Sequence, residues 1–142
     1  MFAVMSNAKQ AYSTVAVETG IESADPHQLV LMLFDGALLS VSSASLHMQR
    51  KEIAQKGEAV SRAINIIANG LKASLNMDVG GDLAEKLSAL YDYMCSRLLQ
   101  ANLHNSPAML EEVSHLLAEL KSAWETIADA PEVKNVRAAA AA

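Results

Sequence analysis

The sequence contains one cysteine, three prolines and only 4% aromatic residues. A single cysteine, Cys95, excludes an intramolecular disulfide and any zinc site built from several cysteines. A lone cysteine among helical apolar residues most often packs as a small hydrophobic side chain. Because aromatic residues are scarce while 51% of the chain is apolar, the core must be aliphatic. Leu, Ala and Met, which are frequent, also favour helices.

Basic residues are few as well. Eleven Lys and Arg residues against sixteen Asp and Glu residues give a net charge of −5. This balance argues against a nucleic-acid partner, which is bound through a basic patch. The densest basic stretch alternates with acidic residues and is interpreted as a solvated, charge-balanced face: Arg50, Lys51, Lys56 and Arg62 with Glu52 and Glu58.

The sequence lacks recognisable targeting features. Residues 1–10 contain no apolar run of the kind found in signal peptides, and we judge no segment long enough to span a membrane. We therefore expect a cytoplasmic protein without stable membrane insertion. A chain of 142 residues suits one domain with a useful core.

Turn residues and apolar periodicity predict four helices, at about 26–49, 53–76, 82–104 and 107–129. Asp25 and Pro26 have the residue types of an N-cap and a first helical position, and Asp82 opens a capping box after a loop at 76–81. Long helices joined by short loops favour an all-α, antiparallel up-down four-helix bundle. Residues 1–24 are predicted to form an N-terminal arm and residues 131–142 a disordered tail.

A di-metal site is the enzyme-like alternative for such a bundle, and it requires inward-facing Glu-x-x-His motifs. The chain has one match, Glu112 to His115, around Val113 on the apolar stripe. Helix geometry turns Glu112 and His115 about 100° and 200° away from that stripe, so both point outward. No nucleophile has a partnered base either. We predict no metal, no cofactor and no enzymatic activity.

Two features indicate close packing or binding. Gly36 and Gly70 lie inside predicted helices, where each costs about 1 kcal/mol relative to alanine; either a neighbouring helix or a bound peptide can pack against them. Apolar residues also exceed one stripe per helix: Val30, Phe34, Leu38, Ile66, Tyr91, Tyr93 and Leu99. No helix of a four-helix bundle is central, so part of this surface is predicted to hold an amphipathic guest helix.

Several ordered blocks carry a family resemblance that runs from about Ala11 to Ile127. The blocks are Ala11–Tyr12 with Val15 and Val17, Ser23–Val30, Met32–Leu38, Ala63–Ile67, Asn69–Leu71, Gly80–Leu83, Leu90–Met94, Arg97–Leu98, Ala101–Asn102, Glu111–Val113, Leu116–Leu117 and Ala123–Trp124. In these blocks the chain resembles the flagellin-specific export chaperones of the FliS family. It departs from the family pattern at Asp25, where serine is common, and in a first interhelical turn without glycine.

The resemblance implies a helical bundle that binds the disordered C-terminal segment of flagellin in an apolar groove, prevents premature polymerisation and delivers flagellin for export. It also implies that the arm covers part of the groove when no client is bound, and that an export-gate component and regulators of flagellar assembly are partners. The predicted partner-binding residues are Tyr12, Val15, Leu29, Leu33, Gly36, Ile64, Ile67, Gly70, Leu71, Leu90, Tyr91, Met94 and Leu98. A generic adaptor for another amphipathic helix, and a homodimer of empty chains, remain open.

Overall fold

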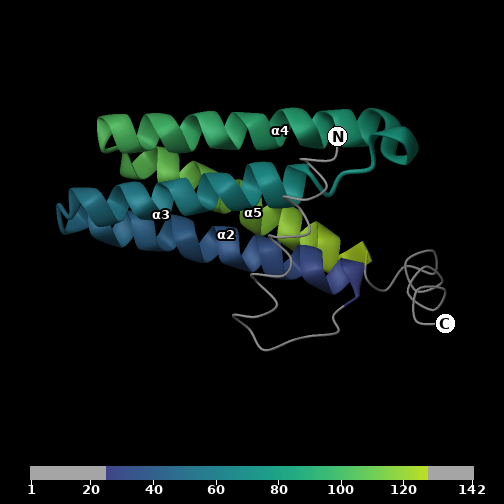
Figure 1. Cartoon of the computed structure of the whole chain (residues 1–142), viewed down its shortest axis with the longest axis horizontal. Coiled ribbons are helices and arrows are strands. Elements are labelled where there is room, and N and C mark those ends of the chain that lie inside the picture. The colour runs from purple at the N-terminus through teal and green to yellow at the C-terminus, as the bar shows by residue number, and fades with distance from the viewer. Residues whose placement is uncertain (1–24, 128–142) are drawn as a thin grey trace.

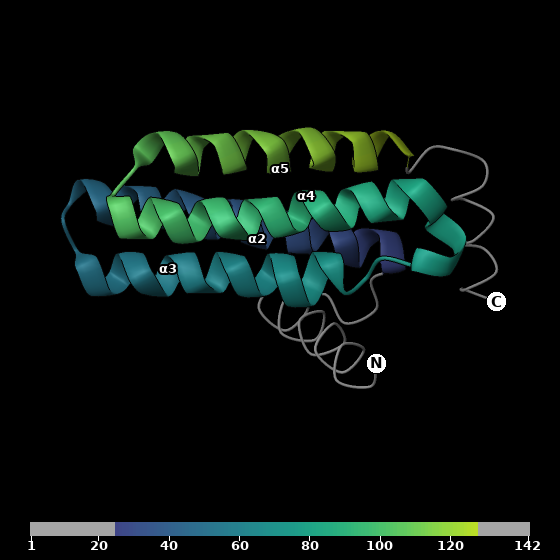
Figure 2. The same ribbon diagram turned by 90° about the horizontal axis from the view of Figure 1, so that it is seen from above.

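The computed structural model describes residues 25–127. The helices are α2 (Pro26–Gln49), α3 (Ile53–Asn65) continued by the π-helical segment η1 (Ile66–Lys72), α4 (Met77–His104) and α5 (Pro107–Ile127). They pack side by side, with α2 across the bundle from α4 and α3 across from α5 (Figures 1 and 2). The predicted all-α four-helix bundle is confirmed. The predicted arm, the predicted tail and residues 128–129 of the fourth predicted helix lie outside the described residues.

The ends of α2 and the start of α5 agree with the prediction because their caps form. The backbone N–H of Gln28 donates to Asp25 Oδ1 at 2.8 Å, and Pro26 occupies the first turn. Likewise, the N–H of Met109 donates to the Ser106 hydroxyl at 3.3 Å. These bonds satisfy N–H groups that have no partner inside a helix.

The predicted helix 53–76 is wrong in its C-terminal third. The α-helix ends at Asn65, η1 takes a wider π-helical path, and helical structure ends at Lys72. Ser74 closes the segment, because its N–H donates to Gly70 O at 3.0 Å and its hydroxyl donates to Leu71 O at 2.7 Å. These two carbonyls are thereby removed from further helix formation.

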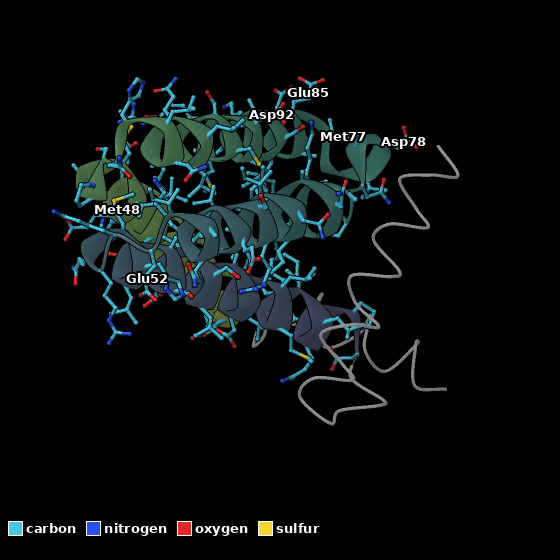
Figure 3. All side chains as sticks on the ribbon, turned by 60° about the vertical axis from the view of Figure 1, so that its left-hand side comes forward. Met48, Glu52, Met77, Asp78, Glu85 and Asp92 are labelled. Carbon is cyan, nitrogen blue, oxygen red and sulfur yellow. The ribbon has the colours of Figure 1, made fainter. Side chains whose placement is uncertain are left out.

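The third helix was predicted to begin at Asp82, after a loop at 76–81, and the structure has an additional helical turn before the kink at Gly81. The side chain of Asn76 accepts hydrogen bonds from the N–H groups of Asp78 at 3.2 Å and Val79 at 3.1 Å, so α4 begins one turn earlier, at Met77. Gly81 then leaves helical geometry at φ 52° and ψ −132°. The first turn of α4 is therefore bent away from the rest of the helix (Figure 1), and Met77 and Asp78 project at that end of the molecule (Figure 3).

The core is aliphatic, as the composition predicted. Its largest fully buried side chains are Leu33, Ile67, Leu71, Met94, Leu98, Leu110, Val113 and Leu117. The two helical glycines lie where α2 and η1 pack against each other, Gly36 on α2 and Gly70 on η1. A Cβ on Gly70 would meet Leu33 of α2 at 3.0 Å, and a Cβ on Gly36 would meet Ile66 of η1 at 3.3 Å. A neighbouring segment of the bundle itself therefore packs against each glycine.

One helix among the described residues, α2, is long and apolar enough to cross a membrane, which differs from the expectation. Asp35 is its only acidic or basic residue besides two histidines. However, α2 contributes Leu33, Phe34, Ala37 and other residues to the buried core. Core helices of globular proteins pass the same test, so length and composition are weak indications of a membrane span.

The basic stretch after α2 was interpreted as solvated, and this is wrong for Lys56. Its side chain is only 5% exposed. The ammonium donates to Asn102 O at 3.0 Å and to the side-chain oxygen of Asn105, at the end of α4. Because Lys56 lies on the face of α3 that packs toward α4, its position on the helix rather than its charge decides its burial.

Candidate functional site: an apolar groove at one end of the bundle

An apolar groove of about 450 Å³ lies where α2 begins, η1 and α5 end, and α4 has its kinked first turns. The lining residues are almost all hydrophobic: Val30, Phe34, Leu71, Ser74, Leu75, Asn76, Val79, Gly80, Leu83, Ala84, Leu87, Tyr91, Leu120, Ala123, Trp124 and Ile127. A concave apolar surface with few polar groups is typical of a binding site.

The groove has a buried floor and exposed walls. Phe34, Leu71 and Tyr91 form the floor and are at most 4% exposed. On the α4 wall, Val79 is 83% and Leu83 is 66% exposed. Large apolar side chains that stand exposed above a buried apolar floor are costly in water. A guest helix that covered them would remove this cost.

Two glycines shape the α4 wall. A Cβ on Gly80 would lie 2.6 Å from the Cβ of Ala84, so only glycine permits this approach of the first turn to the following helix. Gly81 has a positive φ of 52°, which side chains disfavour. Val79 and Leu83, on either side of this pair, both line the groove.

Trp124 on the α5 wall is held in place by His27. The two rings stack with centroids 4.8 Å apart and planes 7° from parallel. His27 Nε2 donates to Trp124 O at 2.7 Å, and Trp124 Nε1 donates to His27 O at 3.1 Å. Since a carbonyl only accepts, Nε2 carries the proton. This reciprocal contact joins the first turn of α2 to the last turns of α5 and fixes the wall before any partner binds.

Farther along the contact between α4 and α5, polar side chains replace the apolar ones. Arg97 Nε donates to Glu112 Oε1 at 2.7 Å, and the Tyr93 hydroxyl donates to Glu112 Oε2 at 2.9 Å. The hydrogen bond from Arg97, followed by that from Tyr93, holds the pKa of Glu112 below its usual value. The same hydrogen bond to Glu112 raises the pKa of Tyr93. Glu112 of α5 is therefore joined to α4 by two hydrogen bonds.

Of the Glu-x-x-His pair, His115 faces outward, as the helix geometry predicted, whereas half-buried Glu112 lies against α4. Glu112 is bound by Arg97 and Tyr93, whereas exposed His115 lies 3.1 Å from Glu119 on the same helix. Within residues 25–127, no group of three or more His, Cys, Asp and Glu side chains could hold a metal ion.

A family model described as flagellar protein FliS matches residues 8–131, which is most of the chain. The chain belongs to the FliS family. It is 52% identical over 118 residues to the flagellar secretion chaperone FliS of Salmonella typhimurium, covering 83% of this chain and 87% of that protein. Identity to the Vibrio cholerae FliS is 40% over 135 residues, or 95% of this chain and 97% of that one. FliS proteins are secretion chaperones and not enzymes, so both predictions are confirmed.

The partner-binding residues predicted from the FliS resemblance occupy three kinds of position. Leu71 and Tyr91 lie in the floor of the groove. Leu33, Ile67, Met94 and Leu98 are core residues with no exposed surface, and Gly70 is buried against Leu33; Leu29, Gly36, Ile64 and Leu90 are half-buried. Tyr12 and Val15 lie outside the described residues. Contact of any of these residues with a partner stays a prediction.

Sequence reasoning missed the contribution of α5 and of the kinked turn to the groove. Leu120, Ala123, Trp124 and Ile127 form one wall, and Val79 and Leu83 form much of the other. Ala123 beside Trp124 widens the apolar stripe of the last helix, which was a usable indication. Val30, Phe34 and Tyr91, by contrast, were recognised as surplus apolar residues, and all three line the groove.

Proposed function

We propose that this flagellar secretion chaperone binds the C-terminal segment of flagellin, and that the apolar groove between α4 and α5 takes one of its helices. The main observation in support is the groove itself, in which exposed Val79 and Leu83 stand above the buried floor of Phe34, Leu71 and Tyr91. An amphipathic helix laid in such a groove buries its own apolar face together with these side chains.

The physical demand on a flagellin chaperone agrees with this geometry. Flagellin polymerises through apolar terminal helices, so a chaperone must bury the same surface. Ordering a disordered segment costs free energy, and stable binding needs an interface of well over roughly 1,000 Å². A groove at one end is too small alone, so the client also follows other exposed apolar side chains, such as Leu39 and Leu99, around the bundle.

We further propose that the arm, through Tyr12 and Val15, covers this groove in the absence of client. The arm precedes Asp25 in the chain, and α2 contributes Val30 and Phe34 to the groove within its first turns. Deletion of residues 1–17 is then expected to leave the bundle folded and to change client affinity. Binding in the cytoplasm, transfer to an export-gate component, contact with flagellar regulators and a homodimer of empty chains belong to the same proposal.

Calorimetric titration with a flagellin C-terminal peptide tests the proposal. Leu83→Ser should weaken binding at least about tenfold, because a buried leucine contributes about 1.5–3 kcal/mol. Leu103→Ser is the matched control, since Leu103 is also on α4 and 71% exposed but outside the groove. Equal losses in both variants would remove any special role of the groove. Absence of binding to the unaltered protein would refute flagellin as the client.

A further inference from the structure

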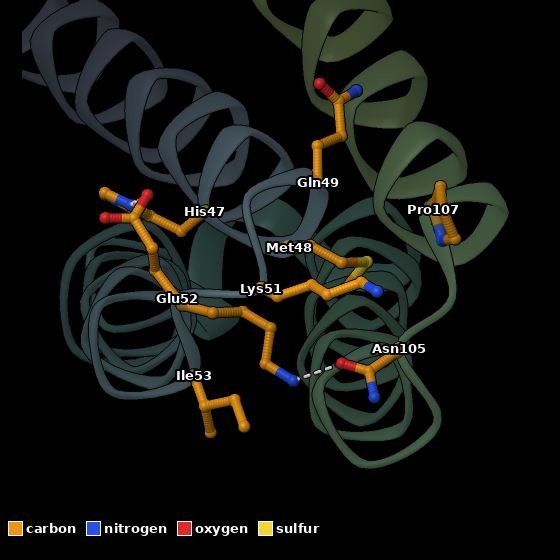
Figure 4. A pocket seen from close by; sticks show the side chains of 9 residues that line it. His47, Met48, Gln49, Lys51, Glu52, Ile53, Asn105 and Pro107 are labelled. Atoms are coloured by element: carbon orange, nitrogen blue, oxygen red, sulfur yellow. Dashed lines mark hydrogen bonds and ion pairs between the residues drawn. The ribbon is translucent and has the colours of Figure 1, made fainter.

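A second cavity, of about 400 Å³, lies at the opposite end of the bundle, between the α2–α3 turn and the α4–α5 turn. Figure 4 shows the nine side chains that line it: His47, Met48, Gln49, Lys51, Glu52, Ile53, Lys56, Asn105 and Pro107. The FliS resemblance and the proposed client groove make no use of these residues.

The buried ammonium of Lys56 is incompletely satisfied. An ammonium has three N–H donors. Two of them reach Asn102 O and the side-chain oxygen of Asn105, both of which are neutral acceptors. Among residues 25–127 no third acceptor and no carboxylate partner for Lys56 is present. Buried charges are ordinarily paired, because an unpaired charge is expensive to remove from water.

The end of α4 neutralises only part of this charge. A helix C-terminus carries roughly half of a negative elementary charge, against the full positive charge of an ammonium. Lys51 adds a second positive charge without an acidic partner in the described part of the chain. The nearby carboxylate, Glu52, accepts from His47 Nδ1 at 3.2 Å, and in Figure 4 this pair lies on the side of the turn away from Asn105.

The two turns that border the cavity are held in unusual backbone geometry. Lys51 and Asn105 both have positive φ, 59° and 49°, although neither is glycine. In Figure 4 the side chains of Lys51 and Met48 extend together from the first turn toward the second. Asn105 caps the end of α4, where a left-handed Asn is common, whereas a lysine in this region is costly. Here the left-handed backbone places a lysine beside the cavity.

The remaining walls are apolar. Met48, Ile53 and Pro107 surround the two lysines, and Ile53 is 76% exposed although it is a large hydrophobic residue. A ligand that satisfies both parts of the cavity needs an anionic group that accepts hydrogen bonds and an adjoining apolar body. We propose that this cavity binds an organic carboxylate with an apolar body, supplied either by a small carboxylic acid or by the C-terminal residue of a peptide.

The test titrates the full chain with N-acetylleucine, with its neutral analogue N-acetylleucinamide, and with an acetylated tripeptide ending in a free leucine. Amide NMR shifts of residues 47–56 and 105–107 report on binding. We expect both acids to shift these signals and the amide to leave them in place. Lys51→Ala should weaken binding of the acids roughly two- to fivefold, as expected for a partly exposed charge contact, whereas Lys86→Ala on α4 should not. Lys56→Met should abolish binding of both acids.

The outcomes separate the sources of the ligand and decide the proposal. Binding of both acids would show that the cavity can hold the C-terminal residue of a peptide. Binding of N-acetylleucine alone would show that it holds only small carboxylic acids. Equal binding of the amide, or no binding of either acid at millimolar concentration, would overturn the proposal. If Lys56→Met does not fold, Lys51→Ala still decides, because unchanged affinity in that variant contradicts the role given to the two lysines. Flagellin binding is not used, so the two proposals fail independently.

Discussion

Replacing Gly70 by alanine should destabilise the bundle, even though alanine is the better helix former. The new Cβ would meet Leu33 Cδ2 at 3.0 Å and Cδ1 at 3.3 Å. Leu33 has no exposed surface, so its methyl groups must give by a few tenths of an ångström among other buried side chains. Relief of this contact therefore disturbs the packing of Leu33 between α2 and η1.

The magnitude follows from two opposing contributions. Alanine in place of glycine inside a helix gains up to about 1 kcal/mol. Overpacking a well-filled core costs about 1–3 kcal/mol. We expect Gly70→Ala to lower the free energy of unfolding by about 1 kcal/mol in total.

Gly57 provides the matched control on the same helical hairpin. A Cβ on Gly57 would meet nothing within 4 Å, so Gly57→Ala should raise the free energy of unfolding by about 0.5–1 kcal/mol. Urea unfolding followed by circular dichroism gives both values from the shift in midpoint. A stabilising effect of Gly70→Ala as large as that of Gly57→Ala would refute the packing explanation.

A double-mutant cycle tests the same contact directly. Leu33→Ala removes the two methyl groups that oppose the new Cβ, at a cost of about 2–5 kcal/mol. In that background Gly70→Ala should become stabilising. Additive effects of the two substitutions would show that Leu33 is not the obstacle.

Three further outcomes are expected. Because the pKa of Glu112 is lowered in the folded protein, its stabilising contribution is present above its ordinary pKa near 4.5 and is lost as the pH falls through the lower folded value. Urea midpoints measured between about pH 6 and pH 3 should therefore fall less in Glu112→Gln than in the unaltered protein, and equal falls would contradict this. Burial raises the pKa of the Cys95 thiol to about 11, so iodoacetamide at pH 8 should label it much more slowly in the folded protein than in urea; equal rates would refute its protection. Trp124→Phe removes the hydrogen bond to His27 O while keeping an aromatic ring, and should cost about 0.5–1.5 kcal/mol in a thermal melt; an unchanged melting temperature would show that this bond adds nothing to the stacking and to the bond from His27 Nε2 to the backbone carbonyl.

Local interactions explain what the sequence predicts well. The bounds of α2 follow from Asp25, Pro26 and an uninterrupted apolar stripe, all of which act within one helix. The π-helical path of η1 does not follow from any such pattern. It lies where Leu33 and Ile66 pack against glycines on the opposite segment, and this contact joins residues of two different helices. The early start of α4 at Asn76 was accessible, since Asn is a common N-cap residue.

The division between core and groove was less accessible for a different reason. Leu87 and Leu98 lie on the same predicted stripe of one helix, yet only Leu87 lines the groove while Leu98 is fully buried. What separates them is their place along the bundle, because only Leu87 lies at the end that carries the groove. The groove there is bordered by the Gly80–Gly81 turn and by Trp124, neither of which affects the periodicity. The prediction that Lys56 lies on a solvated face was wrong for the same reason, because the sequence pattern does not show how neighbouring helices pack.

The contact between His27 and Trp124 has a consequence for the connectivity of the chain. It brings the two ends of the described structure, Asp25 and Ile127, to the same end of the bundle, beside the groove. The chain thus enters and leaves the described bundle next to the proposed client site. A circular permutant with new termini between Gln49 and Ile53 would move both ends away from it, and would allow the groove to be labelled or fused without obstruction.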